Sequence, residues 1–527
     1  MNVLLLSMPD SFEHMPAVAI RMPNGALASL AGNIDPHHHV SIADLILVQS
    51  SVQDTVERLL RDLQPDVVGL SVMTFQRTTA LRIARLIRAR RPETQIVAGG
   101  YDPSLAPDAY AACPEIGFIV RGEGEQTFRE LLRALEGRIG FETVAGLSYR
   151  TSAGVIRNAD RPIARLAADP PRLPNRGARV IGGYTLLGRP VDVVETSRGC
   201  TFDCSFCSII EMRGRNFHTY PIERVLADIG DARRHGARAI FLVDDNITLD
   251  VRRFAALCQA IIDSGFDDTE YFVQAMTSPI AQHGASLAPL MQRAGFRYVF
   301  LGIENILEDD LAFLKAGAKN ARRDHGRPAG NATIDAIDHL HRHGLFVVGG
   351  LIVGNPDDTR ASIDANLAFA RRYVDWPYLQ HPTPYPGTPM TREFVERDLV
   401  VDHDVAHYDG TTAVVRTAHL AADEVEFLRW RAERWMKVRH MPAAFAHSPG
   451  FVLRHGLAML AHTFTGTSLR SVLGLEDERT VFDRYRDRRR QVRDRLMPEP
   501  VLAMESAAAV VADDCSRGDT RSRATAS

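Results

Sequence analysis

Residues 1–140 alternate between short apolar runs and longer stretches that repeat hydrophobic residues every three to four positions. The short runs have the length of buried strands, and the longer stretches have the period of amphipathic helices. Apolar strands that alternate with helices are typical of a parallel sheet covered on both faces. The predicted strands are NVLLLS (2–7), VSIADLIL (40–47), PDVVGLSV (65–72), QIVAGG (95–100) and FIVRG (118–122). We therefore expect a doubly wound, Rossmann-like α/β domain, with ligands bound beyond the carboxyl ends of its strands.

The same alternation resumes at residue 191 and continues to about residue 400. Helical stretches such as PIERVLADIGDARRHG (221–236) separate six apolar runs. Six βα units predict a partial (βα)6 barrel, a relative of the eightfold barrel, with functional residues at the carboxyl ends of the strands. The predicted strands are VDVVETS (191–197), AIFLVDD (239–245), YFVQAMT (271–277), YVFLGIE (298–304), FVVGGLIVG (346–354) and YLQHPTPYPG (378–387).

Local composition divides the rest of the chain. Residues 141–185 include ADPPRLPNRGARVIGG, where proline, glycine and charged residues dominate, as expected of a linker between domains. The barrel core then spans residues 186–400, and residues 401–504 are predicted to form a mostly helical C-terminal region. Residues 505–527 are rich in Ala, Ser, Asp and Arg, which predicts a disordered tail.

The overall composition excludes several classes of protein. The chain has 527 residues and a net charge of −3, with Lys and Arg spread along it, so a nucleic-acid partner is not expected. The N-terminal MNVLLLSMPD lacks the positive region of a signal peptide, and no run of about 18 apolar residues predicts a membrane span. Six cysteines in so long a chain do not form a disulfide scaffold. We expect a cytoplasmic protein whose thiolates are free to bind a metal.

Three cysteines, Cys200, Cys204 and Cys207, lie within CTFDCSFC, just after the first predicted barrel strand. Three thiolates on one short loop can wrap a single metal centre. Structural zinc takes four protein ligands, so it would need another one, such as His218, the nearest histidine downstream. Cysteines that are simply buried are a further alternative. A cubane iron–sulfur cluster explains the missing ligand better, because three thiolates leave one of its four irons open to a substrate.

The stretch SRGCTFDCSFC (197–207) resembles the CxxxCxxC signature of the radical S-adenosylmethionine (SAM) superfamily. The resemblance implies a [4Fe-4S] cluster on the three cysteines and SAM chelated to the open iron through its amino and carboxylate groups. It also implies reductive cleavage of SAM to a 5′-deoxyadenosyl radical. Phe206 matches the aromatic residue that packs near adenine in that family, and core packing is its simpler role.

Four later segments resemble strand motifs of the same family, in the same order: FLVDDN (241–246), GIE (302–304), GLIVG (350–354) and TPYPGTP (383–389). The resemblance places Asp245, Glu304, Gly350 and Gly354 beside SAM. Asp245 is equally suited to cap the following helix. Asp357 stands where the family often has Glu, which leaves its role open.

An α/β domain ahead of such a barrel resembles the cobalamin-binding subfamily of radical SAM proteins. Small residues at the strand ends would let the corrin ring and its nucleotide tail approach the backbone. The residues that the resemblance assigns to cobalamin are Ser71, Thr74, Gly99, Gly100, Gly122, Glu123, Gly124 and Glu125. Two alternatives remain: glycines that only make tight turns, and a doubly wound domain that has lost its ligand.

The stretch Asp35-Pro-His37-His-His39-Val40 is similar to the DxHxxG motif that ligates cobalt in other cobalamin proteins. Here Val40 replaces the glycine, and the stretch enters the second predicted strand, whereas the motif belongs after the first. We therefore interpret the histidines as a surface loop. Cobalamin would then bind without a protein histidine on cobalt, as the resemblance to the subfamily implies.

The number of cysteines excludes some classes of radical SAM enzyme. Methylthiotransferases carry a second cluster on three N-terminal cysteines, whereas this chain has only Cys113 there. Cys258 and Cys515 alone follow the cluster motif, which is too few for an auxiliary-cluster domain. One cluster and one cobalamin remain. The commonest reaction of this pair is methylation of an unactivated carbon, and the active site should then lie between the two domains.

We thus expect a cobalamin-dependent radical SAM C-methyltransferase, loosely similar to hopanoid C-3 methylases, that acts on a small-molecule or lipid substrate. Its external electron donor would be a flavodoxin or ferredoxin. The alternatives are a cobalamin-dependent oxidative cyclase or rearrangement enzyme without methyl transfer, and a non-catalytic metal-binding protein. Residues 451–474 suit either an amphipathic surface for peripheral membrane contact or a packed helix. No catalytic side chain beyond the cluster ligands can be named from the sequence.

Overall fold

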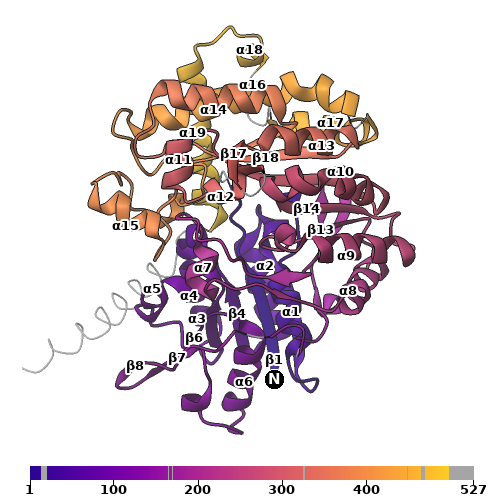
Figure 1. Cartoon of the computed structure of the whole chain (residues 1–527). Helices are drawn as coiled ribbons and strands as arrows, with labels where there is room; N and C mark the ends of the chain where they lie inside the picture. The colour runs from indigo at the N-terminus through magenta and orange to yellow at the C-terminus, as the bar shows by residue number, and fades with distance from the viewer. Residues whose placement is uncertain are drawn as a thin grey trace, which may run out of the picture.

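The computed structural model contains two large sheets and a helical C-terminal region, which follow one another along the molecule (Figure 1). In that view the N-terminal sheet (indigo to purple) lies at one end and the C-terminal helices (orange to yellow) at the other. The predicted order of α/β domain, barrel and helical region is therefore confirmed. The structure describes residues 1–12, 20–163, 165–168, 170–324, 327–447, 449–463 and 469–497. The predicted tail, residues 505–527, lies outside the described residues.

Seven strands form the N-terminal sheet, in the order β3-β1-β4-β5-β6-β7-β8, and the first five are parallel. Side chains of β1 alternate between two apolar layers. Helices α2 and α3 cover one face, and α1 and α6 cover the other. The bounds are β1 Asn2–Ser7, α1 Gly25–Asn33, β3 His39–Asp44, α2 Val52–Leu63, β4 Val67–Ser71, α3 Arg77–Arg90, β5 Gln95–Gly99, α4 Tyr101–Leu105, α5 Pro107–Ala111, β6 Phe118–Val120 and α6 Gly124–Leu135. The predicted doubly wound domain is confirmed.

This sheet continues beyond residue 140, where the sequence predicted its end. β7 (Leu147–Thr151) pairs antiparallel with β6, and β8 (Gly154–Arg157) pairs antiparallel with β7. The first part of the predicted linker, 141–185, is therefore a hairpin at the edge of the N-terminal sheet. The sequence did not reveal β8 because its apolar residues, Val155 and Ile156, are adjacent and both exposed, so the strand lacks the alternation of apolar and polar positions.

Residues 172–175 of the predicted linker are bound along α1. The backbone N–H of Asn175 donates to the Ala28 carbonyl at 2.8 Å, and that of Arg172 donates to Asn33 Oδ1 at 2.9 Å. Gly32 permits this approach, because a Cβ at that position would lie 2.0 Å from the Leu173 carbonyl oxygen. The linker thus forms a fixed strap between the two sheets.

The second sheet contains six parallel strands, as predicted, in the order β19-β18-β15-β14-β13-β10. Two short strands extend it, and one of them, β2 (Ile20–Arg21), comes from the N-terminal domain and pairs with β9 (Thr185–Leu186). The bounds are β10 Arg189–Val194, α8 Ile222–Arg234, β13 Ala239–Leu242, α9 Val251–Asp263, β14 Glu270–Met276, α10 Thr277–Arg293, β15 Phe296–Glu304, α13 Thr333–Arg342, β18 Phe346–Ile352, α14 Arg360–Tyr373, β19 Trp376–Gln380 and α15 Pro389–Glu396. The partial (βα)6 barrel is confirmed.

The C-terminal helices close the amino-terminal end of this barrel. Ala444 of α16 (Ala422–His447) and Val452 of α17 (Pro449–Thr463) are buried in one apolar cluster with residues at the starts of the barrel strands, including Phe272 and Tyr298. After α18 (Leu469–Val472), α19 (Glu478–Leu496) returns to the N-terminal domain, where Met497 joins its core. The amino-terminal end of the barrel is therefore covered, which leaves the functional side at the carboxyl ends.

The segment predicted as either an amphipathic surface or a packed helix has both features. Val452 and His455 face the barrel and are buried, whereas Leu453 and Leu457 are 75% and 84% exposed. Among the described residues, none of the helices combines the length and apolar character that a membrane crossing requires. Peripheral membrane contact by this segment stays a prediction.

Replacing Gly32 with Ala should lower the free energy of unfolding by about 1–3 kcal/mol, because the added methyl group meets strap backbone that is already hydrogen bonded to α1. Gly450→Ala is the matched control, since Gly450 also lies in a helix and a Cβ there meets nothing within 4 Å. Denaturant unfolding of both variants and the wild type measures the difference. Equal stability of Gly32→Ala and the wild type would contradict the tight strap.

Candidate active site

The cysteine loop begins at the carboxyl end of β10 and is held on both sides. β11 (Ser197–Arg198) pairs with β12 (His218–Thr219), and Gly199 then turns with φ of +88°. A Cβ on Gly199 would lie 2.5 Å from the Asn216 carbonyl oxygen, so only glycine fits. Farther along, the Ser205 N–H donates to the Leu314 carbonyl at 3.0 Å. The loop is therefore anchored before and between the cysteines.

Two adjacent carboxylates at the end of β13 fix the start of this loop. Asp244 accepts hydrogen bonds from the Thr196 N–H and hydroxyl, both at 2.6 Å, and burial raises its pKa to about 6. Asp245 accepts from the Gly199 N–H at 2.7 Å and lies 3.6 Å from the Arg213 guanidinium. Asp245 therefore does not cap a helix here; it holds the cysteine loop.

Cys200, Cys204 and Cys207 line one cavity of about 100 Å³ together with Phe206. Burial raises the pKa of Cys204 to about 11 and that of Cys207 to about 12. Thiols in such a place ionise only when a cation replaces the proton, which is what a bound metal centre supplies. The three residues thus fit a thiolate-ligated metal centre.

The spacing of the thiols disfavours a single zinc ion. A tetrahedral ion with Zn–S bonds of about 2.3 Å would hold its sulfurs roughly 3.8 Å apart. Among the described residues, however, these three Sγ atoms are not a group that lies within 4.8 Å of one another. His218 is a member of β12 opposite Arg198, and it does not line the cysteine cavity. An iron–sulfur cubane, which spreads its ligands farther apart, fits the site better.

Glu304 lies on the same cavity, and its partner there was not predicted. Lys319, from α12 (Gly317–Asn320), donates to Glu304 Oε1 at 2.7 Å. Burial by itself would lower the pKa of Lys319, but the carboxylate of Glu304 and the neighbouring thiols raise it above its usual value. A carboxylate and an ammonium side by side suit the amino and carboxylate groups of an amino-acid ligand. No motif surrounds Lys319, so it could not be predicted from the sequence.

The two glycines predicted to contact SAM do not line this cavity. A Cβ on Gly350 would lie 2.8 Å from the ring of Phe300, which does line it, so Gly350 makes room for that ring. Gly354 has φ of +97° and packs against Val425 of α16. A direct adenine contact by either glycine stays a prediction. Asp357 is exposed and pairs with Arg397, away from the cavity.

A second cavity, of about 400 Å³, lies between the N-terminal sheet and the barrel. Seven of the eight residues predicted for cobalamin line it: Ser71, Gly99, Gly100, Gly122, Glu123, Gly124 and Glu125. Thr74 is buried nearby in a short 3-10 turn and does not line it. Gly122 has φ of +72° and open space where a Cβ would be, which leaves backbone accessible to a ligand. The carboxyl ends of β4, β5 and β6 thus form one wall, as the fold class predicted.

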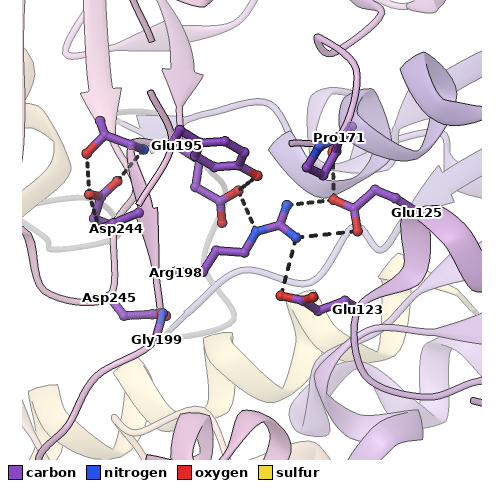
Figure 2. A network of polar contacts seen from close by, with 12 residues as sticks. Glu123, Glu125, Pro171, Glu195, Arg198, Gly199, Asp244 and Asp245 are labelled. Atoms are coloured by element: carbon purple, nitrogen blue, oxygen red, sulfur yellow. Dashed lines mark hydrogen bonds and ion pairs between the residues drawn. The ribbon is translucent and has the colours of Figure 1, made fainter. Parts of the chain in front are cut away.

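The two glutamates of this wall are bound to the cysteine loop (Figure 2). The Arg198 guanidinium lies 2.6 Å from Glu125, 3.4 Å from Glu123 and 2.7 Å from Glu195 of the barrel. Burial would raise the pKa of Glu125, but Arg198 and the Ser29 hydroxyl lower it to about 2. Both glutamates therefore neutralise a buried arginine at the domain interface, and a direct bond to cobalamin stays a prediction.

The histidines of the DxH-like stretch lie away from this cavity. His39 begins β3, as the sequence indicated, and none of His37, His38 and His39 lines either cavity. The prediction of a surface loop is wrong for His38, whose side chain is fully buried. The cavity therefore offers no imidazole from this stretch to a cobalt ion.

Asp245 lines both cavities, so the two sites meet at one residue. Tyr101 and Arg213 lie on the larger cavity close to it. Tyr101 directly follows the predicted Gly99-Gly100 pair, whereas nothing in the sequence pointed to Arg213. Burial raises the pKa of the Tyr101 hydroxyl, with the charge of Asp245 adding to the effect, so the phenol is neutral. A ligand in the larger cavity and one at the cysteines would thus face each other across this boundary.

Two protein families match the chain. The B12 binding domain matches residues 17–132, and the Radical SAM superfamily matches residues 194–370. These ranges correspond to the N-terminal sheet and to the barrel. Together they include more than half of the 527 residues.

Several curated proteins are similar over most of the chain. An uncharacterized methyltransferase from Pyrococcus horikoshii is 26% identical over 88% of this chain and 99% of its own length. The hopanoid C-3 methylase of Methylococcus capsulatus is 25% identical, covering 69% of this chain and 68% of that protein. The anaerobic magnesium-protoporphyrin IX monomethyl ester cyclase of Synechocystis sp. is 27% identical over 61% of this chain, and 64% of the cyclase is covered.

Solved structures share the architecture. The cobalamin-dependent SAM radical enzyme OxsB, solved with aqua-cobalamin and SAM bound, superposes with a TM-score of 0.64 at 17% identity, covering 98% of this chain and 81% of that chain. The radical SAM methyltransferase TsrM from Kitasatospora setae, solved with cobalamin and a [4Fe-4S] cluster, gives 0.60 at 20% identity, covering 75% and 78%. At these identities the likeness establishes the common fold.

Glu125→Gln should lower the free energy of unfolding by about 3 kcal/mol, the lower end of the cost of breaking a buried ion pair, because Glu195 still binds Arg198. The matched control is Glu93→Gln, an exposed glutamate of the same domain. Denaturant unfolding at pH 7 measures both variants. The pKa of Glu125 lies below its usual value of 4.5, so its contribution is present above pH 4.5 and is lost as the pH falls toward 2. The difference in free energy of unfolding between the wild type and Glu125→Gln should become smaller over that pH range. A difference that does not change with pH would contradict the ion pair.

Proposed function

Because this chain belongs to the radical SAM proteins that carry a B12-binding domain, we propose that it is a cobalamin-dependent C-methyltransferase. Its substrate would be an unactivated carbon of a small molecule or lipid. Names of similar proteins, which include a methyltransferase and a methylase, support this choice. The cluster supplies reductive cleavage of SAM when it is bound, and cobalamin supplies a cobalt that carries the methyl group.

The observation that carries the proposal is the position of Asp245 on the wall of both cavities. Radical methylation needs hydrogen removal and methyl delivery at one carbon, so the two cofactors have to face each other across the substrate. The cysteine cavity and the glycine-lined cavity adjoin at this residue. Asp245 also holds Gly199 next to Cys200, which fixes the cluster loop against the second cavity.

Residues of the chain provide binding and orientation in this proposal. Cys200, Cys204 and Cys207 hold the cluster. Glu304 accepts a hydrogen bond from the amino group of SAM and Lys319 donates one to its carboxylate, since the two side chains already form a complementary pair 2.7 Å apart on this cavity. Among the described residues, Phe202, Phe206 and Phe300 bring aromatic rings to the same cavity, where adenine would stack.

The second candidate is an oxidative cyclase that uses the same cofactors without methyl transfer. The similarity to the Synechocystis cyclase favours it, although the chain spans less than two thirds of that protein. A non-catalytic metal-binding protein is the third candidate, and the adjoining cavities disfavour it, because such a protein needs no second cavity beside its metal.

We further propose a cytoplasmic enzyme that receives its electrons from a flavodoxin or ferredoxin, since cluster chemistry of this kind needs a reductant.

The decisive measurement is the product balance with reduced, cobalamin-loaded enzyme and SAM carrying a deuterated methyl group. Incubation with a fractionated extract of small molecules and lipids should give S-adenosylhomocysteine and 5′-deoxyadenosine in equal amounts per labelled product. Cys204→Ala should lose iron and all 5′-deoxyadenosine, whereas His218→Ala should keep both. A product formed with 5′-deoxyadenosine but without the label would refute methylation and favour the cyclase. Zinc in place of iron would favour the third candidate.

Lys319→Met should raise the KM for SAM by about tenfold or more, because one charge-assisted hydrogen bond to the SAM carboxylate is worth about 1.5–3 kcal/mol. Its iron content should equal that of the wild type. Lys315→Met serves as the control, since Lys315 lies four residues away and is exposed. SAM-dependent formation of 5′-deoxyadenosine gives the KM, and an unchanged value in Lys319→Met would remove Lys319 from the SAM site.

A further inference from the structure

Two histidines and a glutamate meet at the far end of α6, outside both cavities. Glu136 directly follows α6, whereas Glu125 is near the start of this helix. His37 Nε2 lies 2.7 Å from Glu136 Oε1, and His38 Nε2 lies 3.7 Å from the same oxygen. One ligand atom from each residue lies within 4.8 Å of the other two. Such a set of two imidazoles and one carboxylate is typical of zinc sites that keep an open position.

His38 provides an independent sign of a missing ligand. Its side chain is fully buried, and its Nε2 makes no hydrogen bond with the described residues. Buried ring nitrogens nearly always have a hydrogen-bond partner, because burial without one costs desolvation energy that no hydrogen bond offsets. This nitrogen faces the carboxylate of Glu136 at a distance that is too long for a hydrogen bond and suitable for two ligands of one ion.

The surrounding residues hold the three ligands in place. Asp35 binds Arg133 of α6 at 2.6 Å, one turn before Glu136, and its carbonyl accepts from the His38 N–H at 3.1 Å. The second oxygen of Glu136 pairs with Arg138 at 3.4 Å, which leaves Oε1 for the ion. His38 Nδ1 lies 3.2 Å from the amino nitrogen of Met1. With an ion on Nε2 the ring proton is on Nδ1 and is donated to the Met1 amino group in its uncharged form, so binding of the ion releases a proton there.

We propose that His37, His38 and Glu136 bind one divalent transition-metal ion, for which Zn²⁺ is the representative. Bonds of about 2.0–2.1 Å to a tetrahedral ion place ligand atoms roughly 3.3 Å apart. The two observed separations, 2.7 Å and 3.7 Å, lie on either side of that value, so small rotations of the side chains complete the site. Water takes the fourth position, because His37 is half exposed.

An ion at this position would join two elements of the N-terminal domain, with water in place of a fourth protein ligand. It links the end of α6 to the turn before β3, and Figure 1 shows α6 beside the start of β1 at the same end of the molecule. Twelve residues of α6 span about 18 Å, so the site is far from the cavity lined by Glu125. The ion would fix the helix whose first turn binds Arg198.

The test uses the full-length protein with its cluster reconstituted, so that iron occupies the cysteines. After equilibration with buffered Zn²⁺, zinc and iron per chain are measured for the wild type, His38→Gln, Glu136→Gln and the control His39→Gln. His39 is the exposed neighbour in the same loop and is no member of the set. The wild type and His39→Gln should bind one zinc per chain. The other two should lose it or bind at least about tenfold more weakly, with iron unchanged in all four.

Thermal unfolding gives a second readout, because an ion that binds only the folded state raises Tm. Zn²⁺ should raise the Tm of the wild type and His39→Gln, but not that of Glu136→Gln. Equal zinc in the wild type and Glu136→Gln, or no effect of Zn²⁺ on the wild-type Tm, would overturn the proposal. Glu136 is exposed, so Glu136→Gln should fold and can test the proposal even if His38→Gln fails to fold. Iron content and 5′-deoxyadenosine formation report separately on the proposed function.

Discussion

The buried guanidinium of Arg198 is the interaction on which the site depends. It comes from the loop that carries the cysteines, and its carboxylate partners belong to two different domains: Glu123 and Glu125 to the N-terminal sheet, and Glu195 to the barrel. A buried charge is costly unless it is paired on all sides, so the arginine is stable only when the two domains are docked. The same contact therefore closes the domain interface and aligns the cysteine loop with the glycine-lined wall. Tyr220, which donates to Glu195 at 3.0 Å, extends the network into the barrel.

The two carboxylates that follow β13 bind different parts of that loop. Asp244 accepts hydrogen bonds from Thr196 and Ser197 at the start of the loop. Asp245 accepts one from Gly199 and also lines both cavities. Both residues lie in the loop that follows β13, where the chain bends at Asp245. A pair of identical residues thus contains one that only supports the loop and one that also faces the ligands.

Contacts between segments that are far apart in the sequence link the two domains around this interface. The strap of residues 172–175 lies along α1, and β2 crosses from the N-terminal domain to the barrel sheet. At the other end, Met497 inserts into the N-terminal core. Each contact joins segments that are far apart in the chain, and together they hold the two sheets on either side of the cavity. Placing two cofactors face to face requires such a constraint.

The sequence by itself determined the fold class, the six barrel strands and the cysteine loop, because these follow from local periodicity and from ligand spacing within eight residues. The resemblance to the cobalamin-binding subfamily named seven residues of the larger cavity, and they lie together because parallel strands bring their carboxyl ends to one edge. Only the tertiary structure decided what Glu123 and Glu125 bind, that Lys319 meets Glu304, that β7 and β8 extend the first sheet, and that His38 is buried beside Glu136. Each of these depends on residues far apart in the chain. Their side chains carry no periodic signal, and long-range packing alone brings them together.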